Sequence, residues 1–174
     1  MKAGHRVIGI IGWKNSGKTR MVAALVAELN WRGWAVSTIK HAHHDFDIDH
    51  EGTDSWTHRK SGAREVAIVS GRRWALMHEN SADDDEPPLA DMLNRLSPCD
   101  IVLIEGYKRE AHAKIEIRRT SAADNAPLSS GDETIVAVVS DDPDATAGDL
   151  PVFGHDAVSD VADFIERQTG LDRR

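Results

Sequence analysis

Short apolar runs alternate with amphipathic segments along most of this chain. The apolar runs predict buried strands at residues 6–11, 35–39, 101–104, 135–139 and 151–153. Between them, apolar residues recur at i, i+3, i+4 and i+7, the spacing of one helix face. The sets are Val22-Leu25-Val26-Leu29, Leu89-Met92-Leu93-Leu96 and Val158-Val161-Ala162-Ile165. Strands that alternate with helices indicate a mostly parallel sheet covered on both faces.

Two segments depart from this parallel plan. Residues 65–70 and 74–77 predict two strands joined through Gly71-Arg72-Arg73. That arrangement is a β-hairpin, which serves either as an edge addition or as a surface for a partner. Residues 114–118 alternate charged side chains with isoleucine. This alternation predicts an exposed strand or an edge strand.

A glycine-rich motif lies between the first predicted strand and the first predicted helix. Residues 12–19, GWKNSGKT, match the phosphate-binding loop (P-loop) template G-x-x-x-x-G-K-[ST] at every fixed position. The glycines let the backbone turn tightly around a phosphate, and its N–H groups then point inward. The lysine can reach the β- and γ-phosphates of a nucleoside triphosphate, and the final hydroxyl can bind Mg²⁺. The predicted nucleotide-binding residues are Gly12, Trp13, Lys14, Asn15, Ser16, Gly17, Lys18 and Thr19.

This loop fixes the expected fold class as α/β. We expect a P-loop NTPase-like three-layer fold with a mostly parallel sheet and an added β-hairpin. The chain has 174 residues, which suits one nucleotide-binding domain over residues 1–174 and is short for two.

Composition narrows the classes of partner. The formal net charge is −8, so attraction to a nucleic-acid backbone is not expected. The single cysteine, Cys99, cannot form an internal disulfide, which suits a reducing compartment. No stretch approaches the roughly 20 apolar residues of a membrane span, and the N-terminus lacks a secretory signal pattern. We therefore expect a cytoplasmic protein without a membrane partner.

A second chemical signal ends the strand predicted at residues 101–104. That strand runs directly into Glu105 and Gly106. In P-loop proteins, a carboxylate at the carboxyl end of a neighbouring strand helps to hold Mg²⁺. The predicted metal-linked pair is therefore Thr19 and Glu105, with Glu105 able to act through a water; the other interpretation is that Glu105 caps a turn.

Residues 40–50, KHAHHDFDIDH, hold four histidines and three aspartates. Imidazole and carboxylate suit Zn²⁺ or Ni²⁺, but the stretch has no cysteine and no helical histidine pair. It also follows a strand that should end beside the nucleotide, so a contact with substrate or triphosphate is the second interpretation, and a polar surface loop the third. The candidate residues are Lys40, His41, His43, His44, Asp45 and Asp54.

Two weaker signals concern the base and the phosphates. Ser140-Asp141-Asp142 follows the strand at residues 135–139, and an acid there can accept the N–H groups of guanine. The basic residues of Gly106-Tyr107-Lys108-Arg109 can clamp phosphates. Both segments are also ordinary turn chemistry. No catalytic residue is identified, because the sequence has no recognisable group to position an attacking water.

The combination of motifs resembles one family over nearly the whole chain. GWKNSGKT, IKHAHHDFDIDHEGTDSWTHRKSGA, RRWALMHE and IVLIEGYKREAHAKIEIRR together resemble the molybdopterin-guanine dinucleotide biosynthesis protein B (MobB) family. The resemblance implies a homodimeric GTP-binding protein with weak GTPase activity and Mg²⁺ as cofactor. It further implies an accessory role beside the MobA-type nucleotidyltransferase, which attaches GMP to molybdopterin; direct contact with molybdopterin stays open.

Two other functional classes remain compatible with the residues. A small-molecule P-loop kinase needs an arginine lid, for which Arg72-Arg73 or Arg118-Arg119 are available. A metal-delivery GTPase would use the histidine-rich stretch, although the chain lacks any Cys-Cys or Cys-His ligand pair.

Overall fold

The computed structural model describes residues 5–42, 46–81 and 86–171. The chain divides into two compact units, one formed by Met1–His41 with Leu89–Arg174 and the other by Ala42–Pro88. We describe each unit by itself, and the expectation of a single domain stays a prediction. No helix in the described ranges is long and apolar enough to cross a membrane.

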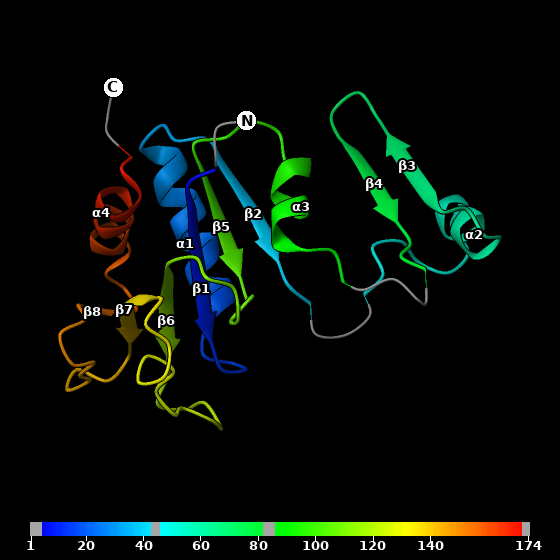
Figure 1. Cartoon of the computed structure of the whole chain (residues 1–174). Helices are drawn as coiled ribbons and strands as arrows, with labels where there is room; N and C mark the ends of the chain where they lie inside the picture. Colours follow the sequence, from blue (N-terminus) through cyan, green and yellow to red (C-terminus); the bar gives the residue numbers. More distant parts are fainter. Residues whose placement is uncertain (1–4, 43–45, 82–85, 172–174) are drawn as a thin grey trace. The chain divides into compact units, whose positions relative to one another are not determined.

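The larger unit is built on a six-stranded parallel sheet (Figure 1). Its strand order is β2-β5-β1-β6-β7-β8, which places the strand before the P-loop near the middle. The strands are β1 (Val7–Gly12), β2 (Val36–Lys40), β5 (Ile101–Glu105), β6 (Lys114–Arg118), β7 (Ile135–Ser140) and β8 (Val152–Gly154). Neighbours pair in parallel, with Gly9 opposite Ile104 on one side and Lys114 on the other.

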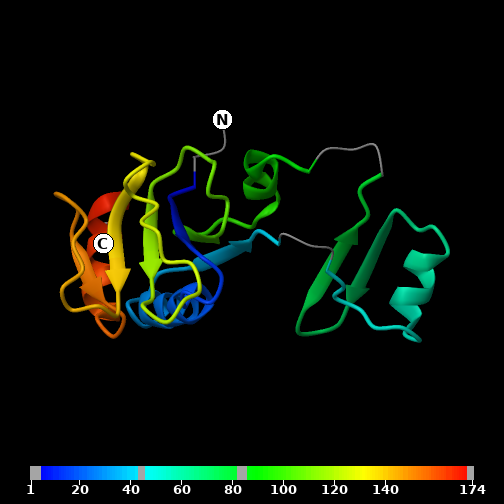
Figure 2. The same ribbon diagram turned by 90° about the horizontal axis from the view of Figure 1, so that it is seen from below.

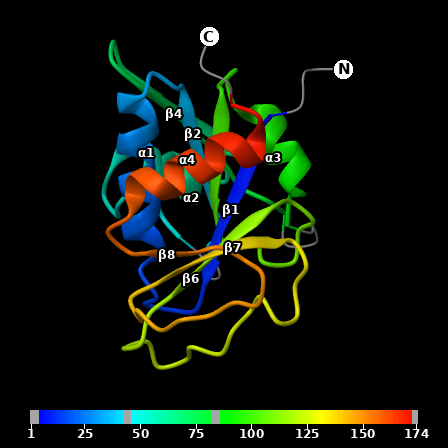
Figure 3. The same cartoon turned by 90° about the vertical axis from the view of Figure 1, so that its left-hand side faces the viewer.

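Helices cover both faces of this sheet, as predicted. Helices α1 (Lys18–Trp31) and α4 (Val158–Thr169) lie side by side on one face (Figure 3). Helix α3 (Leu89–Arg95) covers the opposite face (Figure 2). Ile8 and Ile10 of β1 pack with Leu25 and Leu29 of α1 in the main core. The layered α/β fold is therefore confirmed.

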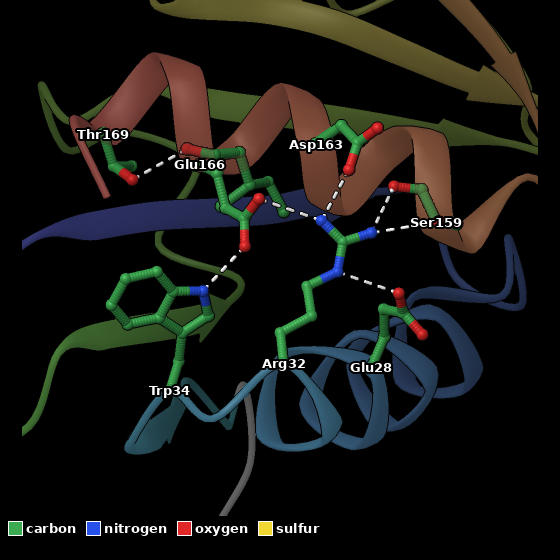
Figure 4. Close-up of polar contacts among 8 residues, drawn as sticks. Glu28, Arg32, Trp34, Ser159, Asp163, Glu166 and Thr169 are labelled. Atoms are coloured by element: carbon green, nitrogen blue, oxygen red, sulfur yellow. Dashed lines mark hydrogen bonds and ion pairs between the residues drawn. The ribbon is translucent and has the colours of Figure 1, made fainter. Parts of the chain in front are cut away.

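One arginine ties α1 to α4 (Figure 4). The side chain of Arg32, just after α1, is only 3% exposed. Its guanidinium donates to Glu28 at 2.9 Å, to Glu166 at 2.9 Å, and to Asp163 and Ser159 of α4. Gly33 then adopts φ 95°, where glycine is favoured, and the chain turns toward β2.

The smaller unit holds α2 (Asp54–Lys60) and the predicted hairpin of β3 (Glu65–Val69) and β4 (Trp74–His78). The two strands pair antiparallel, with Glu65 opposite His78 and Val69 opposite Trp74. The added β-hairpin is therefore confirmed, and it forms a sheet of its own, so the alternative of an addition at the edge of the parallel sheet is wrong. Four of its apolar side chains are exposed: Ile68 by 44%, Val69 by 75%, Trp74 by 69% and Leu76 by 47%.

The expectation of an exposed or edge strand at residues 114–118 is wrong. β6 lies between β1 and β7, and both Lys114 and Glu116 are 1% exposed. Ile115 and Ile117 face the main core, so the charged residues occupy the opposite face. There Glu116 accepts hydrogen bonds from the backbone N–H groups of Leu128 and Ser129, at 2.8 and 3.1 Å. The charges are tolerated because the loop after β6 satisfies them.

The partners of the second buried charge in β6 complete this polar layer. Lys114 donates to Asp132 at 3.1 Å and also to the hydroxyl of Thr134. Glu116 is further paired with Arg118 at 2.9 Å. Arg118 also donates to Ser129 and to the carbonyl of Thr146, so both terminal nitrogens of its guanidinium are engaged in this layer.

Candidate functional site

The P-loop turns between the end of β1 and the start of α1. Gly12 adopts φ 151° and Gly17 φ 98°, and Asn15 takes a left-handed φ of 63°. A Cβ on Gly12 would lie 2.4 Å from the carbonyl oxygen of Ile117 and 2.6 Å from Oγ of Ser16. The loop therefore requires glycine at its first position, for close approach as well as for conformation.

Lys18 is the first residue of α1 and points back over the loop. Its ammonium donates to the carbonyl oxygens of Gly12 at 3.0 Å and Trp13 at 2.6 Å. Burial is the main cause that lowers its pKa, and Lys108 and Lys40 lower it further while Glu105 opposes them. A half-buried ammonium with two other ammonium groups near it gains from an anionic ligand, which is the property expected of a phosphate site.

Ser16 adds an unsatisfied polar group to the same loop. Its hydroxyl is buried, and the structure gives it no hydrogen-bond partner within the described ranges. A buried donor without a partner is costly unless a ligand or a water satisfies it. The hydroxyl of Ser16 is therefore available to a ligand of the loop.

Thr19 and Glu105 are brought together, as the sequence anticipates. Oγ1 of Thr19 donates to Oε1 of Glu105 at 2.8 Å. The same carboxylate oxygen lies 3.4 Å from Nζ of Lys40, which ends β2. A hydroxyl and a carboxylate beside a P-loop form the oxygen-rich set that Mg²⁺ prefers, so the residues present fit this metal.

The histidine-rich stretch is only partly described. His41 follows β2, donates its backbone N–H to the carbonyl of Glu105 at 2.9 Å, and stacks on Tyr107 with ring centroids 4.4 Å apart. Asp54 begins α2 in the smaller unit. His43, His44 and Asp45 lie outside the described residues. Within the described residues, no three His, Cys, Asp or Glu side chains gather as a metal cluster would.

Trp13 links the P-loop to two neighbouring segments. Its indole N–H donates to the carbonyl of Ala126 at 2.8 Å, and the ammonium of Lys108 lies 4.1 Å from the centre of its ring. Cation–π contacts of this kind contribute about 0.5–1 kcal/mol at partly exposed sites. Lys108 is therefore held beside the loop by Trp13, a contact that sequence spacing alone does not reveal.

An open pocket of about 530 Å³ lies at the carboxyl ends of β7 and β8. Its lining includes the predicted segment Ser140-Asp141-Asp142 and also His155. A Cβ built on Gly17 would lie 3.3 Å from the ring of His155 and 3.7 Å from Arg119, so the P-loop adjoins this wall. Nothing in the sequence pointed to His155 at the site, and Arg119 was named only within the possible arginine lid of a kinase; the fold brings both next to Gly17.

The two acids of this pocket differ in their engagement. Asp141 accepts the backbone N–H of Thr120 at 2.8 Å, a hydrogen bond that holds its pKa below the usual range. Within residues 5–42, 46–81 and 86–171, the one hydrogen bond to the carboxylate of Asp142 comes from the backbone N–H of Asp144, at 3.0 Å to Oδ1. Asp142 thus has more acceptor capacity for a ligand than Asp141.

Comparison with known proteins identifies close relatives. A family model described as molybdopterin guanine dinucleotide synthesis protein B matches residues 7–141. A molybdopterin-guanine dinucleotide biosynthesis adapter protein of Haemophilus influenzae is 36% identical over 163 residues, covering 92% of this chain and 87% of that protein. The adapter protein of the same name from Escherichia coli is 35% identical, covering 91% of this chain and 90% of that protein.

Solved structures agree in fold. The crystal structure of Bacillus subtilis MobB superposes with a TM-score of 0.73 at 21% identity, covering 94% of this chain and 97% of that one. A crystal structure of a molybdopterin-guanine biosynthesis protein B gives a TM-score of 0.70 at 25% identity, covering 93% of this chain and 99% of that one.

Proposed function

The chain belongs to the molybdopterin guanine dinucleotide synthesis protein B family, and we propose that it acts as a GTP-binding accessory protein in the assembly of this cofactor. Its partner in this role is the MobA-type nucleotidyltransferase. The observation that carries the proposal is the meeting of Thr19 and Glu105 at 2.8 Å beside a complete P-loop. The site is thereby equipped for a nucleoside triphosphate with its metal, which generic strand-to-helix turns are not.

Each part of the proposed site has its own task. Residues 12–19 bind the phosphates, with Lys18 leaving the carbonyls of Gly12 and Trp13 to meet the β- and γ-phosphates. Thr19 and Glu105 hold Mg²⁺, which when bound neutralises charge on the β- and γ-phosphate oxygens. If molybdopterin contacts this chain directly, it does so near Lys40 and His41, which contact the side chain and the backbone carbonyl of Glu105 respectively.

The base belongs in the pocket beside the P-loop. Guanine presents N1–H and N2–H₂ donors, whereas adenine presents an acceptor at N1. Asp142 lines this pocket and keeps acceptor capacity, so we assign it the guanine contact. Asp141 supports the pocket wall through Thr120.

Hydrolysis in this site is slow under the proposal. Glu105 is a carboxylate whose charge acts on the P-loop lysine, and it already accepts a hydrogen bond from Thr19. A carboxylate held in this way orients a metal shell rather than activating a water. The nucleotide-bound state is then the signal, and weak GTPase activity resets it.

The proposal also includes a homodimer in the cytoplasm. An isolated two-stranded hairpin is marginally stable in water, and one face of β3-β4 leaves the apolar side chains of Val69, Trp74 and Leu76 exposed. A second copy of the chain covering this hairpin would remove that apolar surface from water.

Calorimetry with GTP and with ATP, each with Mg²⁺, tests the nucleotide assignment. GTP should bind more tightly, and Lys18→Ala should lower GTP affinity about 10- to 150-fold, since a charge-assisted phosphate contact contributes about 1.5–3 kcal/mol. Lys60→Ala, an exposed lysine on α2, is the matched control and should bind as the wild type does. ATP binding equal to GTP binding would remove the guanine assignment, and full affinity in Lys18→Ala would remove the P-loop as the site.

A further inference from the structure

One carboxylate oxygen at the site serves two donors. Oε1 of Glu105 accepts from Thr19 at 2.8 Å and lies 3.4 Å from the ammonium of Lys40. Lys40 and Glu105 are direct partners in the β2–β5 register, at the carboxyl ends of both strands. The pairing therefore follows from sheet geometry, because the two side chains start from facing backbone positions.

The two members of this ion pair differ sharply in exposure. The side chain of Glu105 is 12% exposed, whereas that of Lys40 is 62% exposed. A carboxylate so shielded needs a positive partner. An exposed lysine loses little free energy when it leaves its partner, because ion pairs of exposed side chains contribute only about 0.2–1 kcal/mol. Another cation can therefore replace Lys40 at Glu105 at a small cost in free energy.

A divalent cation at Glu105 and the ammonium of Lys40 would compete for the same oxygen. Lys18 and Lys108 already crowd the site with positive charge, and Lys40 adds to the lowering of the Lys18 pKa. Two cations beside one carboxylate repel each other, so Lys40 must move away from Glu105 when the metal arrives.

We propose that Lys40 is a built-in competitor for Mg²⁺, which occupies Glu105 in the metal-free protein and is released when the metal binds. This inference rests on the proposed function, since it assumes that Glu105 supports Mg²⁺ beside a bound nucleotide. Lys40 and His41 are the last residues of the larger unit before Ala42. The side chain that changes partner therefore stands where the chain leaves the nucleotide-binding unit.

The test measures GDP binding to the full chain by calorimetry at increasing Mg²⁺ concentrations. GDP is used because it lacks the γ-phosphate that a released Lys40 would reach. Lys40→Met should lower the half-saturating Mg²⁺ concentration about 1.5- to 5-fold, since the competing ion pair is gone. Lys40→Arg, which keeps the charge, should restore the wild-type value, and Lys60→Met, the same charge change on α2, should not move it.

An unchanged or raised half-saturating Mg²⁺ concentration in Lys40→Met would overturn the inference, whereas the proposed function as a GTP-binding protein would stand. A shift of the same size in Lys60→Met would also overturn it, since the effect would then be one of net charge. If the wild type binds GDP no better with Mg²⁺ than without, the metal role of Glu105 fails and the competition fails with it. Loss of GDP binding altogether, with or without metal, would instead remove the proposed function.

Discussion

A single histidine gives the larger unit a dependence on pH. Both ring nitrogens of His112 are buried and have no hydrogen-bond partner in the described part of the chain. Burial, aided by the charge of Lys114, lowers the pKa of this imidazole from 6.5 to about 4. The folded protein therefore favours the neutral ring.

The unfolded chain binds more protons than the folded chain between pH 6.5 and about 4 at this residue. Its stabilising contribution is thus fully present above pH 6.5 and declines as the pH falls toward 4. His112→Gln should flatten the acid limb of stability by less than the full value of about 1.4 kcal/mol per pH unit, because the ring is only partly shielded. Urea unfolding at pH 5, 6 and 7 measures this slope; an unchanged slope, or the same change in the exposed-surface control His58→Gln, would contradict the assignment.

The positions of the candidate site residues were predictable where the motif is local in the sequence. The spacing from Gly12 to Thr19 identifies the P-loop without any fold, because eight consecutive residues make it. Glu105 could be identified too, since it ends an apolar strand. Lys114 and Glu116 were misread as exposed because their partners, among them Leu128 and Asp132, lie in a loop that sequence pattern cannot place.

At the scale of elements, periodicity predicted each helix and strand of the sheet layers but not how the helices are joined. Arg32 lies 134 residues from Glu166, and its part in holding α1 to α4 appears only in the folded chain (Figure 4). Helical patterns show which face is apolar, whereas the polar pairs at the rim of that face depend on how two helices meet.

Arg32→Met should destabilise the protein by about 1.5–3 kcal/mol, because it leaves Glu28, Asp163 and Glu166 without their shared cation. Thermal or urea unfolding measures the loss. Arg20→Met is the matched control, since Arg20 is 73% exposed on α1 and its ion pair, at 3.5 Å, is with the exposed Asp156. That variant should change stability by less than about 0.5 kcal/mol. Equal effects of the two substitutions would show that the Arg32 cluster does not join the helices.

At the scale of the whole molecule, the sequence correctly predicted the hairpin as a pair of strands. It did not decide whether those strands join the parallel sheet, and the structure shows that they form a separate sheet. A hairpin can be read from the sequence because its two strands are joined by a local turn, whereas membership of a larger sheet depends on strands far away in the chain. Val69, Trp74 and Leu76 are exposed on one face of the hairpin, and this apolar face supports the proposed homodimer.

Trp74→Ser should weaken self-association of the full chain at least tenfold, because a large aromatic side chain would no longer be buried between copies. Sedimentation velocity over a concentration series measures the change. Trp31→Ser is the control: Trp31 is 81% exposed on α1 and should leave association unaltered. A wild-type chain that stays monomeric at every concentration, or equal weakening by both substitutions, would exclude this hairpin as the dimer surface.

The buried carboxylate of Glu116 in β6 holds the loop after β6, and the P-loop is bonded to the same loop. Glu116 fastens the backbone at Leu128 and Ser129, while Trp13 of the P-loop is fastened to Ala126, only two residues before Leu128. Ile117, the next residue of the same strand, sets the close backbone approach at Gly12. The loop after β6 is therefore a poor place for insertions or deletions, despite its turn-rich composition: a change in its length would be transmitted through Trp13 to the phosphates.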